Sequence, residues 1–191
     1  MIDLYFEIRK RICPFDEVVR HIPTKQKILD LGCGRGILYN YYLKNFNYIE
    51  YTGLDINKKN INKLNKSCNK NCYFKNQDLE KDKINFSEYD CILMIDVMHH
   101  LKKNFQNKIM EKILGEMKIG STLIYKDISN RSFFKGFANR VHDLIFSMQL
   151  INYYDSEKII DYAKNNLKIS GIKKYHTQNF WYDHEFLIIK K

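Results

Sequence analysis

A glycine-rich loop follows the first apolar run of the chain and is the clearest sign of chemistry in the sequence. The run Ile28–Leu31 leads into the loop Gly32–Gly36 and then into a segment with helical spacing. Glycines suit a tight turn where a ligand must approach backbone that carries no Cβ atom. A dinucleotide site would place its third glycine one position later, where Ile37 stands. Because Asp30 would repel a diphosphate and attract a cation, the loop favours a positively charged cofactor.

An acidic residue also ends the second apolar run. Asp55 follows Tyr51–Leu54 and stands nineteen positions after Gly36. A carboxylate at the tip of the neighbouring strand can accept hydrogen bonds from both hydroxyls of a ribose. Taken alone, Asp55 is equally suited to cap the next helix with Asn57, and the glycine loop is compatible with an ordinary strand-to-helix turn. The two features together indicate a nucleoside site.

With Asp30 included, the loop resembles the first signature motif of class I S-adenosylmethionine-dependent methyltransferases. Counting this loop, four sites lie in the order of that family, from Asp30 to about Lys126. The resemblance implies a three-layer α/β/α Rossmann-like fold and S-adenosylmethionine as the cofactor. It also implies that the first two sites bind this cofactor through Asp30, Gly32, Cys33, Gly34, Gly36, Asp55 and Ile56.

Two later motifs take their expected roles from the same resemblance. Asp78 and Leu79 look like the family segment that meets the adenine ring, since a carboxylate can accept the exocyclic amine and a leucine can contact the purine. The alternative for Asp78 is the cap of a short helix. Asp96 and Val97, after the apolar run Tyr89–Ile95, are expected near the cofactor.

Histidines are the first candidates for catalysis. His99 and His100 are followed by Leu101, and this sequence is similar to the start of the helix after the fourth strand in small-molecule methyltransferases. An imidazole with an unperturbed pKa of about 6.5 can take a proton near neutrality, so either residue is a candidate general base. A packing or capping role is the alternative. His142 is a third candidate catalytic residue.

Alternating strands and helices must position these residues. Short apolar runs rich in β-branched and aromatic residues alternate with longer segments of helical spacing, which is typical of a parallel sheet covered by helices. Because only Thr177–Asp183 separates the last two strands, we expect an antiparallel hairpin at the end of a seven-stranded, mostly parallel sheet. The expected strands are Lys27–Leu31, Glu50–Leu54, Cys72–Lys75, Tyr89–Ile95, Ser121–Lys126, Gly171–His176 and His184–Ile189. The expected helices are Asp3–Ile12, Phe15–His21, Ile37–Asn45, Lys58–Cys68, Asn104–Glu116, Phe134–Leu150 and Asp155–Asn166.

One domain with two additions is the expected organisation. The chain has 191 residues, 45% of them hydrophobic, and no linker interrupts the alternation. Residues 1–24 are expected to form a helical cap. Residues 127–150 form an insertion after the fifth strand, and its place at the carboxyl edge of a parallel sheet makes it a candidate substrate lid. Its basic and aromatic members are Arg131, Phe133, Phe134, Lys135, Phe137, Arg140, His142 and Phe146.

Composition argues against several classes of protein. Met1–Glu7 has no signal-peptide pattern and no apolar run approaches the roughly 20 residues of a membrane span, so we expect a cytoplasmic location. The five cysteines are scattered and odd in number, which predicts no disulfide framework. Cys68 and Cys72 lack a second pair of ligands, so no metal site is expected. The net charge of +10 is compatible with an anionic partner, but the lysines from Lys58 to Lys75 are more simply a solvated helix face.

A small or carrier-bound molecule is the expected methyl acceptor, because the chain is short and its insertion carries aromatic side chains. Lys126–Asp127 and His142–Asp143 are the most suggestive polar pairs, since each lies in apolar surroundings. The expected substrate-side residues are Tyr5, Arg9, His99, Lys126, Asp127, Arg131, Arg140, His142 and Trp181.

Two alternatives stay open at this point. An RNA methyltransferase would account for the positive charge and for the basic, aromatic insertion. Against it, the segment after the fourth strand contains neither an Asn/Asp-Pro-Pro-aromatic sequence nor a Pro-Cys pair. A Lys-Asp-Lys-Glu set for ribose would have to come from Lys10, Asp96, Lys126 and Glu157. The second alternative is a non-catalytic cofactor-binding subunit, and the oligomeric state stays open.

Overall fold

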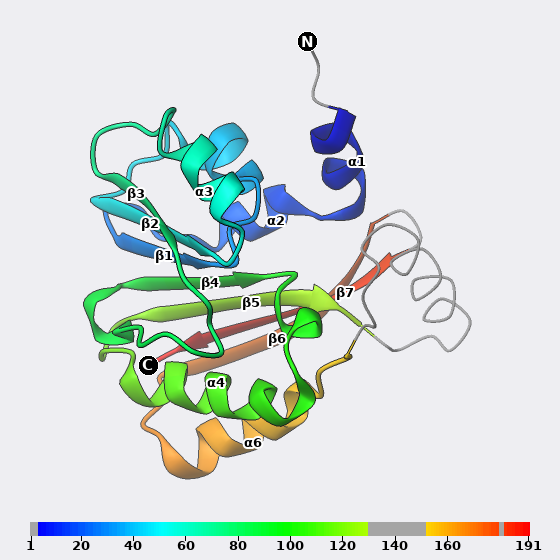
Figure 1. Cartoon of the computed structure of the whole chain (residues 1–191). Helices are drawn as coiled ribbons and strands as arrows, with labels where there is room; N and C mark the ends of the chain where they lie inside the picture. Colours follow the sequence, from blue (N-terminus) through cyan, green and yellow to red (C-terminus); the bar gives the residue numbers. More distant parts are fainter. Residues whose placement is uncertain (1–3, 130–151, 180–181) are drawn as a thin grey trace.

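The computed structural model describes residues 4–129, 152–179 and 182–191, and these are built around a sheet of seven strands (Figure 1). The strand order is β3-β2-β1-β4-β5-β7-β6. Neighbouring strands are parallel except where β7 pairs with β5 and with β6. The strands are β1 Lys27–Leu31, β2 Glu50–Asp55, β3 Cys72–Asn76, β4 Cys91–Ile95, β5 Thr122–Ile128, β6 Gly171–Asn179 and β7 Tyr182–Lys190.

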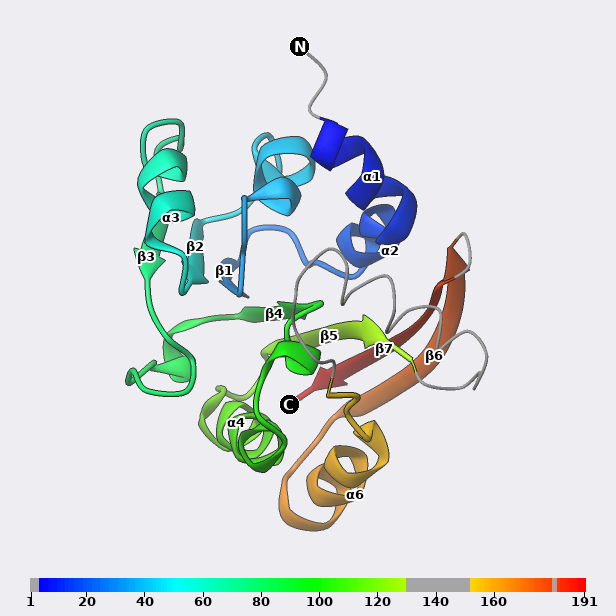
Figure 2. The same ribbon diagram turned by 45° about the vertical axis from the view of Figure 1, so that its right-hand side comes forward.

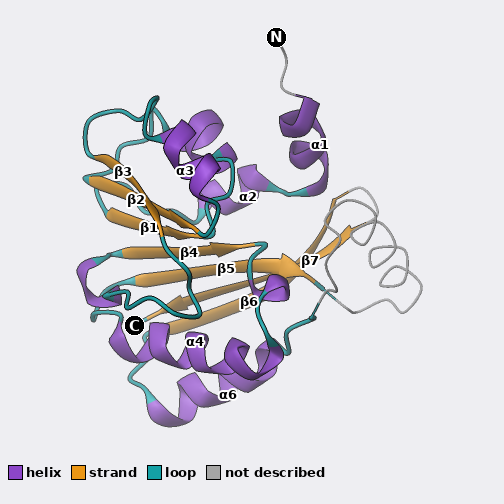
Figure 3. Cartoon of the chain, viewed as in Figure 1, coloured by secondary structure: helices purple, strands orange, loops and turns teal. Residues whose placement is uncertain are grey.

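Helices cover both faces of the sheet (Figures 2 and 3). Side chains alternate along each buried strand, so that Ile28 and Leu93 pack on the side of α2 and α3, whereas Leu29 and Met94 pack on the side of α4 and α6. The chain therefore has two apolar cores, one on each side of the sheet. The helices are α1 Leu4–Ile12, α2 Phe15–Arg20, a π-helix at Tyr39–Leu43, α3 Lys58–Leu64, α4 Lys103–Glu116, α6 Ser156–Asn166 and short 3₁₀ turns at Phe86–Glu88 and Met98–His100.

The strand order creates a crevice beside the glycine loop. β1 lies between β2 and β4. The strand order runs from β1 through β2 to β3 on one side and from β4 to β5 on the other, so its direction reverses at β1. In open α/β sheets such a switch point lies at the carboxyl ends of the strands, and ligands bind there. The glycine loop follows β1 and Asp96 follows β4, so both lie at this point.

All seven predicted strands and the C-terminal hairpin are confirmed, with ends that differ by at most three residues. One change matters for function. β5 continues to Ile128, so Asp127 belongs to the sheet, and the insertion predicted over residues 127–150 was placed too early. The strand is longer because Asp127 and Ile128 pair with Glu185 and His184 of β7.

Two of the predicted helices differ from those observed. The helix expected over Ile37–Asn45 is a π-helix over Tyr39–Leu43, and α3 ends at Leu64 rather than at Cys68. The helix expected over Phe134–Leu150 lies outside the described residues, as does most of the candidate lid.

Within the described part of the chain, no helix is both long enough and apolar enough to cross a membrane. All five cysteines lie in this part, as free thiols. Its His, Cys, Asp and Glu side chains form no group of three or more that could hold a metal ion.

Gly53 in β2 provides a test of the packing beneath the crevice. A Cβ atom at Gly53 would lie 2.7 Å from Cδ1 of Phe74 and 3.0 Å from Sγ of Cys33. Phe74 is buried in the core, so we expect Gly53→Ala to lower the free energy of unfolding by about 1–3 kcal/mol in urea titrations. Gly115 in α4 is the matched control because a Cβ atom there meets nothing within 4 Å. Gly115→Ala should raise the free energy of unfolding by about 0.5–1 kcal/mol, and equal losses from both variants would contradict this packing.

Candidate functional site

A cavity of about 780 Å³ opens at the carboxyl ends of β1, β2 and β4, and α1 forms one of its walls. This volume suits a nucleoside together with a small organic molecule. Gly36 is the exception among the predicted cofactor residues, since it does not line the cavity. The predicted residues that do line it are Asp30, Gly32, Cys33, Gly34, Asp55, Ile56, Asp78, Leu79, Asp96, Val97, His99 and His100, together with Tyr5 and Arg9.

The glycine loop leaves open space at its centre. Gly32, Gly34 and Gly36 all have positive φ, at 70°, 57° and 70°, which other residues rarely adopt. A Cβ atom at Gly32 would lie 2.5 Å from Cγ2 of Val97, and one at Gly36 would collide with Leu64 of α3. At Gly34 the nearest atom is the Gly32 carbonyl oxygen, 4.0 Å away. Gly36 therefore serves the packing of α3, whereas Gly34 presents bare backbone to the cavity.

Asp30 is a buried acid without a cation beside it in the described residues. Its Oδ2 accepts a hydrogen bond of 2.5 Å from the Tyr51 hydroxyl. Burial, helped by the nearby charge of Asp55 and opposed by the Tyr51 hydrogen bond, raises the pKa of Asp30 to about 7. A cationic ligand would supply the missing counter-charge, so this wall of the cavity fits a sulfonium cofactor that also carries an ammonium group.

Asp55 connects the glycine loop to the tip of β2. Its Oδ2 accepts from the backbone N–H of Gly34 at 2.8 Å, and its Oδ1 accepts from that of Asn57 at 2.7 Å. The N-cap of α3 is Asn57, whose own Oδ1 accepts from Lys59 and Asn60. The capping role considered for Asp55 thus belongs to its neighbour, and the Asp55 carboxylate lines the cavity.

The loop after β3 places Asp78 and Leu79 in the same wall. Asp78 accepts from the backbone N–H of Glu80 at 2.9 Å and pairs with Lys81 at 3.0 Å. The hydrogen bond and charge of Lys81 hold the pKa of Asp78 below its usual value. Glu80 pairs with Lys102 at 2.9 Å, which ties this loop to the segment after β4.

Asp96 forms a buried group with two cations. Its Oδ1 accepts from Nζ of Lys126 at 2.6 Å and its Oδ2 from Nη2 of Arg9 at 2.9 Å. Burial opposes the negative charge, but Lys126 and Arg9 outweigh it and hold the pKa of Asp96 well below its usual range. Asp96 also has a positive φ of 55°, and its backbone N–H donates to the carbonyl of Lys126 at 2.8 Å. Such strained backbone persists where the surroundings determine it from several sides.

His99 lines the cavity and pairs with Asp127, which does not. Nδ1 of His99 is hydrogen-bonded to Oδ1 of Asp127, and Oδ2 of Asp127 accepts from the backbone N–H of His99 at 3.2 Å. Lys126 and Asp127 are adjacent in the sequence but have different partners. Successive residues of β5 point to opposite faces of the sheet, so Lys126 reaches Asp96 and Asp127 reaches His99.

The structure also shows where other predicted residues lie, and it adds one residue to the cavity. Lys10 is exposed on α1 and Glu157 pairs with Lys174, so the Lys-Asp-Lys-Glu set is not assembled. Tyr182 of β7 lines the cavity, although no motif pointed to it, because β7 continues past the end of β5. The expected substrate residues that lie outside the described part are Arg131, Arg140, His142 and Trp181, together with Asp143.

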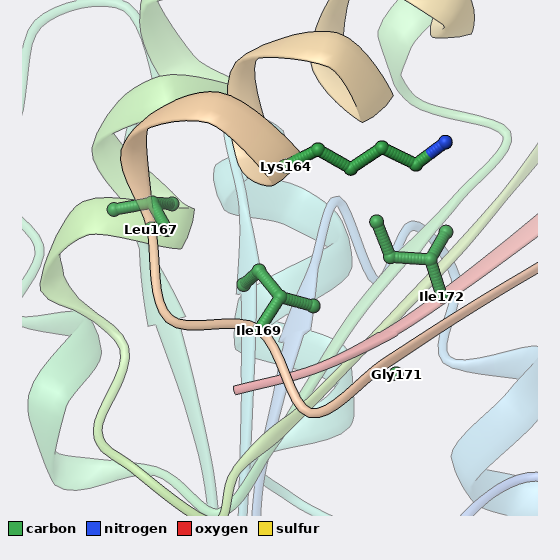
Figure 4. A pocket seen from close by; sticks show the side chains of 5 residues that line it. All are labelled: Lys164, Leu167, Ile169, Gly171 and Ile172. Carbon is green, nitrogen blue, oxygen red and sulfur yellow. The ribbon is translucent and has the colours of Figure 1, made fainter.

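A second, smaller hollow lies between α6 and β6 (Figure 4). Its volume is about 340 Å³, and Leu167, Ile169 and Ile172 line it beside the stem of Lys164. It contains none of the predicted site residues. The large cavity at the switch point is therefore the candidate functional site.

Removing the Lys126 ammonium tests the buried ionic group. Lys126→Met leaves the carboxylate of Asp96 with Arg9 as its one remaining cation. We expect the free energy of unfolding at neutral pH to fall by about 3–5 kcal/mol in urea titrations, because a buried charge has lost a partner. Adding Asp96→Asn to this variant should recover part of the loss, and no recovery would contradict the proposed cause.

Comparisons with known proteins identify a methyltransferase domain. Residues 29–123 match the profile of a family described as "Methyltransferase domain", which spans the chain from β1 into β5. A search of curated protein sequences finds no significant match.

Similar solved structures share the fold. A SAM-dependent methyltransferase from Archaeoglobus fulgidus is 17% identical, with a TM-score of 0.73 over 99% of this chain and 100% of that one. The N-methyltransferase NodS of Bradyrhizobium japonicum, in complex with S-adenosylhomocysteine, is 13% identical, with a TM-score of 0.67 over 100% and 89%. Magnesium protoporphyrin IX methyltransferase of Synechocystis, also with bound S-adenosylhomocysteine, is 17% identical, with a TM-score of 0.63 over 93% and 82%. The chain therefore contains a methyltransferase domain at residues 29–123, and its fold is that of class I, Rossmann-like S-adenosylmethionine-dependent methyltransferases.

Proposed function

We propose that this enzyme methylates a small organic acceptor, free or attached to a carrier, that binds between α1 and the ends of β4 and β5. The observation that supports this proposal is that His99, held by Asp127, lines the same cavity as the glycine loop. When bound, S-adenosylmethionine supplies a methyl group on a sulfonium, which is an excellent leaving group. The protein has chiefly to hold the acceptor in line and to remove a proton where the acceptor has one to lose.

In this proposal the cofactor occupies the glycine-loop side of the cavity. Asp30 balances its positive charge, Asp55 accepts hydrogen bonds from the ribose hydroxyls, and Asp78 with Leu79 meets the adenine. Gly34 offers backbone that no side chain obstructs. The other residues assigned to the cofactor are Gly32, Cys33, Gly36, Ile56, Asp96 and Val97, with Gly36 acting through the position of α3.

We assign the role of general base to His99. In this assignment Asp127 accepts from Nδ1–H, which fixes the ring, and Nε2 takes the proton of the acceptor. Asp127 also accepts from the backbone N–H of Ile128 at 2.7 Å, so the carboxylate itself is held in place. His100 is exposed, whereas His99 is buried, and their ring centres lie 4.0 Å apart. The contact with Asp127 is why we assign the role to His99 rather than to His100.

Apolar side chains on the acceptor side support an organic molecule over a nucleic acid. Ile8 and Ile12 of α1, Ile128 of β5 and Tyr182 of β7 line this side. One structural neighbour is a methyltransferase of magnesium protoporphyrin IX, which is itself a small molecule. An RNA acceptor is the second candidate, and the lysine-rich α3 favours it. That helix packs on β2 and β3, whereas the His99–Asp127 pair lies at β4 and β5.

We also propose that residues 1–191 act as one domain, with residues 1–24 as a helical cap, in the cytoplasm. α1 supports the cap because it lines the cavity through Tyr5, Ile8, Arg9 and Ile12. Phe6 stacks on Tyr41 with ring centres 3.6 Å apart, which fixes α1 beside the π-helix.

A labelling experiment tests the acceptor class. The purified enzyme is incubated with cell extract and S-adenosylmethionine labelled on its methyl group. We expect the label in a small, organic-soluble product that protease and ribonuclease leave intact. Label that ribonuclease releases would support the RNA alternative instead, and binding of the cofactor without any labelled product would support a non-catalytic subunit.

Asp30 provides a pH test of the cofactor site. Because burial raises its pKa to about 7, Asp30 is largely protonated below that pH in the free protein, whereas a cationic cofactor favours the ionised form. The affinity for S-adenosylmethionine should therefore rise between about pH 6 and about pH 8 in calorimetric titrations. Asp30→Asn should bind more weakly and lose this rise. An unchanged pH dependence in Asp30→Asn would rule out the assigned role.

Substitution of His99 tests the proposed base. His99→Asn should lower kcat by about 10²–10⁴-fold on the labelled acceptor, because the proton acceptor is gone. Asp127→Asn should lower kcat as well, through loss of the fixed ring orientation. Affinity for S-adenosylhomocysteine should change little in either variant. His21→Gln, outside the cavity, is the matched control, and a His99→Asn enzyme with normal kcat would assign His99 to packing alone.

A further inference from the structure

The position of α1 separates two ends of the cavity. Near its start, the ring of Tyr5 lies under the guanidinium of Arg35 in the glycine loop, 4.1 Å from the ring centre. One turn later Arg9 reaches Asp96 at the tip of β4. Just beyond the helix, Sγ of Cys13 accepts from Nζ of Lys126 in β5 at 3.5 Å. Arg9 therefore lies on the acceptor side of the helix, toward β4 and β5.

Arg9 is the more exposed of the two cations that pair with Asp96. Lys126 is fully buried and bonds the other oxygen of the carboxylate. Asp127 points to the other face of β5 and is hydrogen-bonded to His99. Arg9 lines the cavity and Lys126 does not, so Arg9 is the cation of this group that a ligand can reach.

The Arg9 guanidinium also has donors to spare. A guanidinium has five N–H donors in a fixed fork, and among the described residues Arg9 uses only Nη2, toward Asp96. Its side chain is 27% exposed and lines the cavity, as do Ile8 and Ile12 of the same helix. A half-buried guanidinium with unused donors among apolar side chains is suited to a carboxylate, which matches its fork with two parallel hydrogen bonds.

We propose that Arg9 binds a carboxylate of the methyl acceptor, so that the substrate is an apolar organic acid. This inference rests on the proposed function and adds to it the class of substrate. The single guanidinium and the apolar lining fit one carboxylate better than a doubly charged phosphate. The carboxylate is held at Arg9, while the atom to be methylated faces the cofactor and His99.

The test compares acids with their amides on the full-length protein in the presence of S-adenosylhomocysteine. The probes are benzoate and benzamide, phenylacetate and phenylacetamide, indole-3-acetate and indole-3-acetamide, and octanoate and octanamide. By calorimetry, at least one acid should bind about tenfold or more tightly than its amide, as expected for a hydrogen bond between charged groups. Arg9→Gln should abolish this preference and Arg9→Lys should keep part of it. No preference in any pair, or a preference that Arg9→Gln leaves intact, overturns the proposal.

A matched variant separates the local effect from the loss of charge. Arg11 is exposed on the same helix and does not line the cavity. Arg11→Gln removes the same charge and should keep the full preference for the acid. Thermal unfolding shows whether each variant is folded. A loss of preference in Arg11→Gln would assign the effect to net charge and overturn the role of Arg9.

The cofactor also has a carboxylate, and a further comparison distinguishes the two sources. S-adenosylhomocysteine carries the amino-acid carboxylate, whereas methylthioadenosine lacks it. Arg9→Gln should leave the affinity for both unchanged within about twofold, since Arg9 serves the acceptor. A loss of affinity for S-adenosylhomocysteine alone would place the cofactor's carboxylate at Arg9 and overturn the proposal. Failure of the native protein to bind S-adenosylhomocysteine would instead refute the cofactor site. In that case the affinities for each acid and its amide would be compared on the protein without cofactor, and the same two outcomes would decide the role of Arg9.

Discussion

The carboxylate of Asp96 holds together parts of the chain that are far apart in sequence. It binds Lys126 of β5 and Arg9 of α1, and it stands at the tip of β4 in a left-handed backbone conformation. Charges are tolerated inside proteins only when they are paired, so none of the three can be buried at low cost without the others. The acceptor side of the cavity is therefore shaped by an ionic group as well as by apolar packing.

Two acids of one cavity have pKa values shifted in opposite directions by their surroundings. Asp96 has two cations beside it, which keep its pKa low despite burial. Among the described residues Asp30 has the hydroxyl of Tyr51 but no cation beside it, and burial raises its pKa to about 7. The protein thus pairs the charge of Asp96 internally and leaves that of Asp30 without a cation. One wall of the cavity would therefore be stabilised by a positively charged ligand, and another already holds two cations.

Motifs that lie close together in the sequence could be predicted, and pairs between strands could not. The glycine loop, Asp55 and the seven strands were visible because turn geometry and alternating hydrophobicity are local properties. The family match and the sheet confirm the fold class and the cofactor. The partners of Lys126 and Asp127 could not be predicted, because neighbours in a strand face opposite sides and their contacts depend on how β5 lies against β4 and β7. Tyr182 lines the cavity because of how β7 pairs with β5, and no local sequence pattern indicates this.

The place of β7 between β5 and β6 has a consequence for how the chain is made. Thr122 pairs with Lys190, so the outer edge of β5 is covered by a strand that the ribosome delivers more than fifty residues later. Until then β5 exposes unpaired N–H and C=O groups, which is the state in which strands add to those of other molecules. Pairings this distant in sequence also slow folding, because a long loop must close first. A nascent chain of this enzyme is therefore most exposed to aggregation after β5 is synthesised and before β7 emerges, when a chaperone would have most to protect.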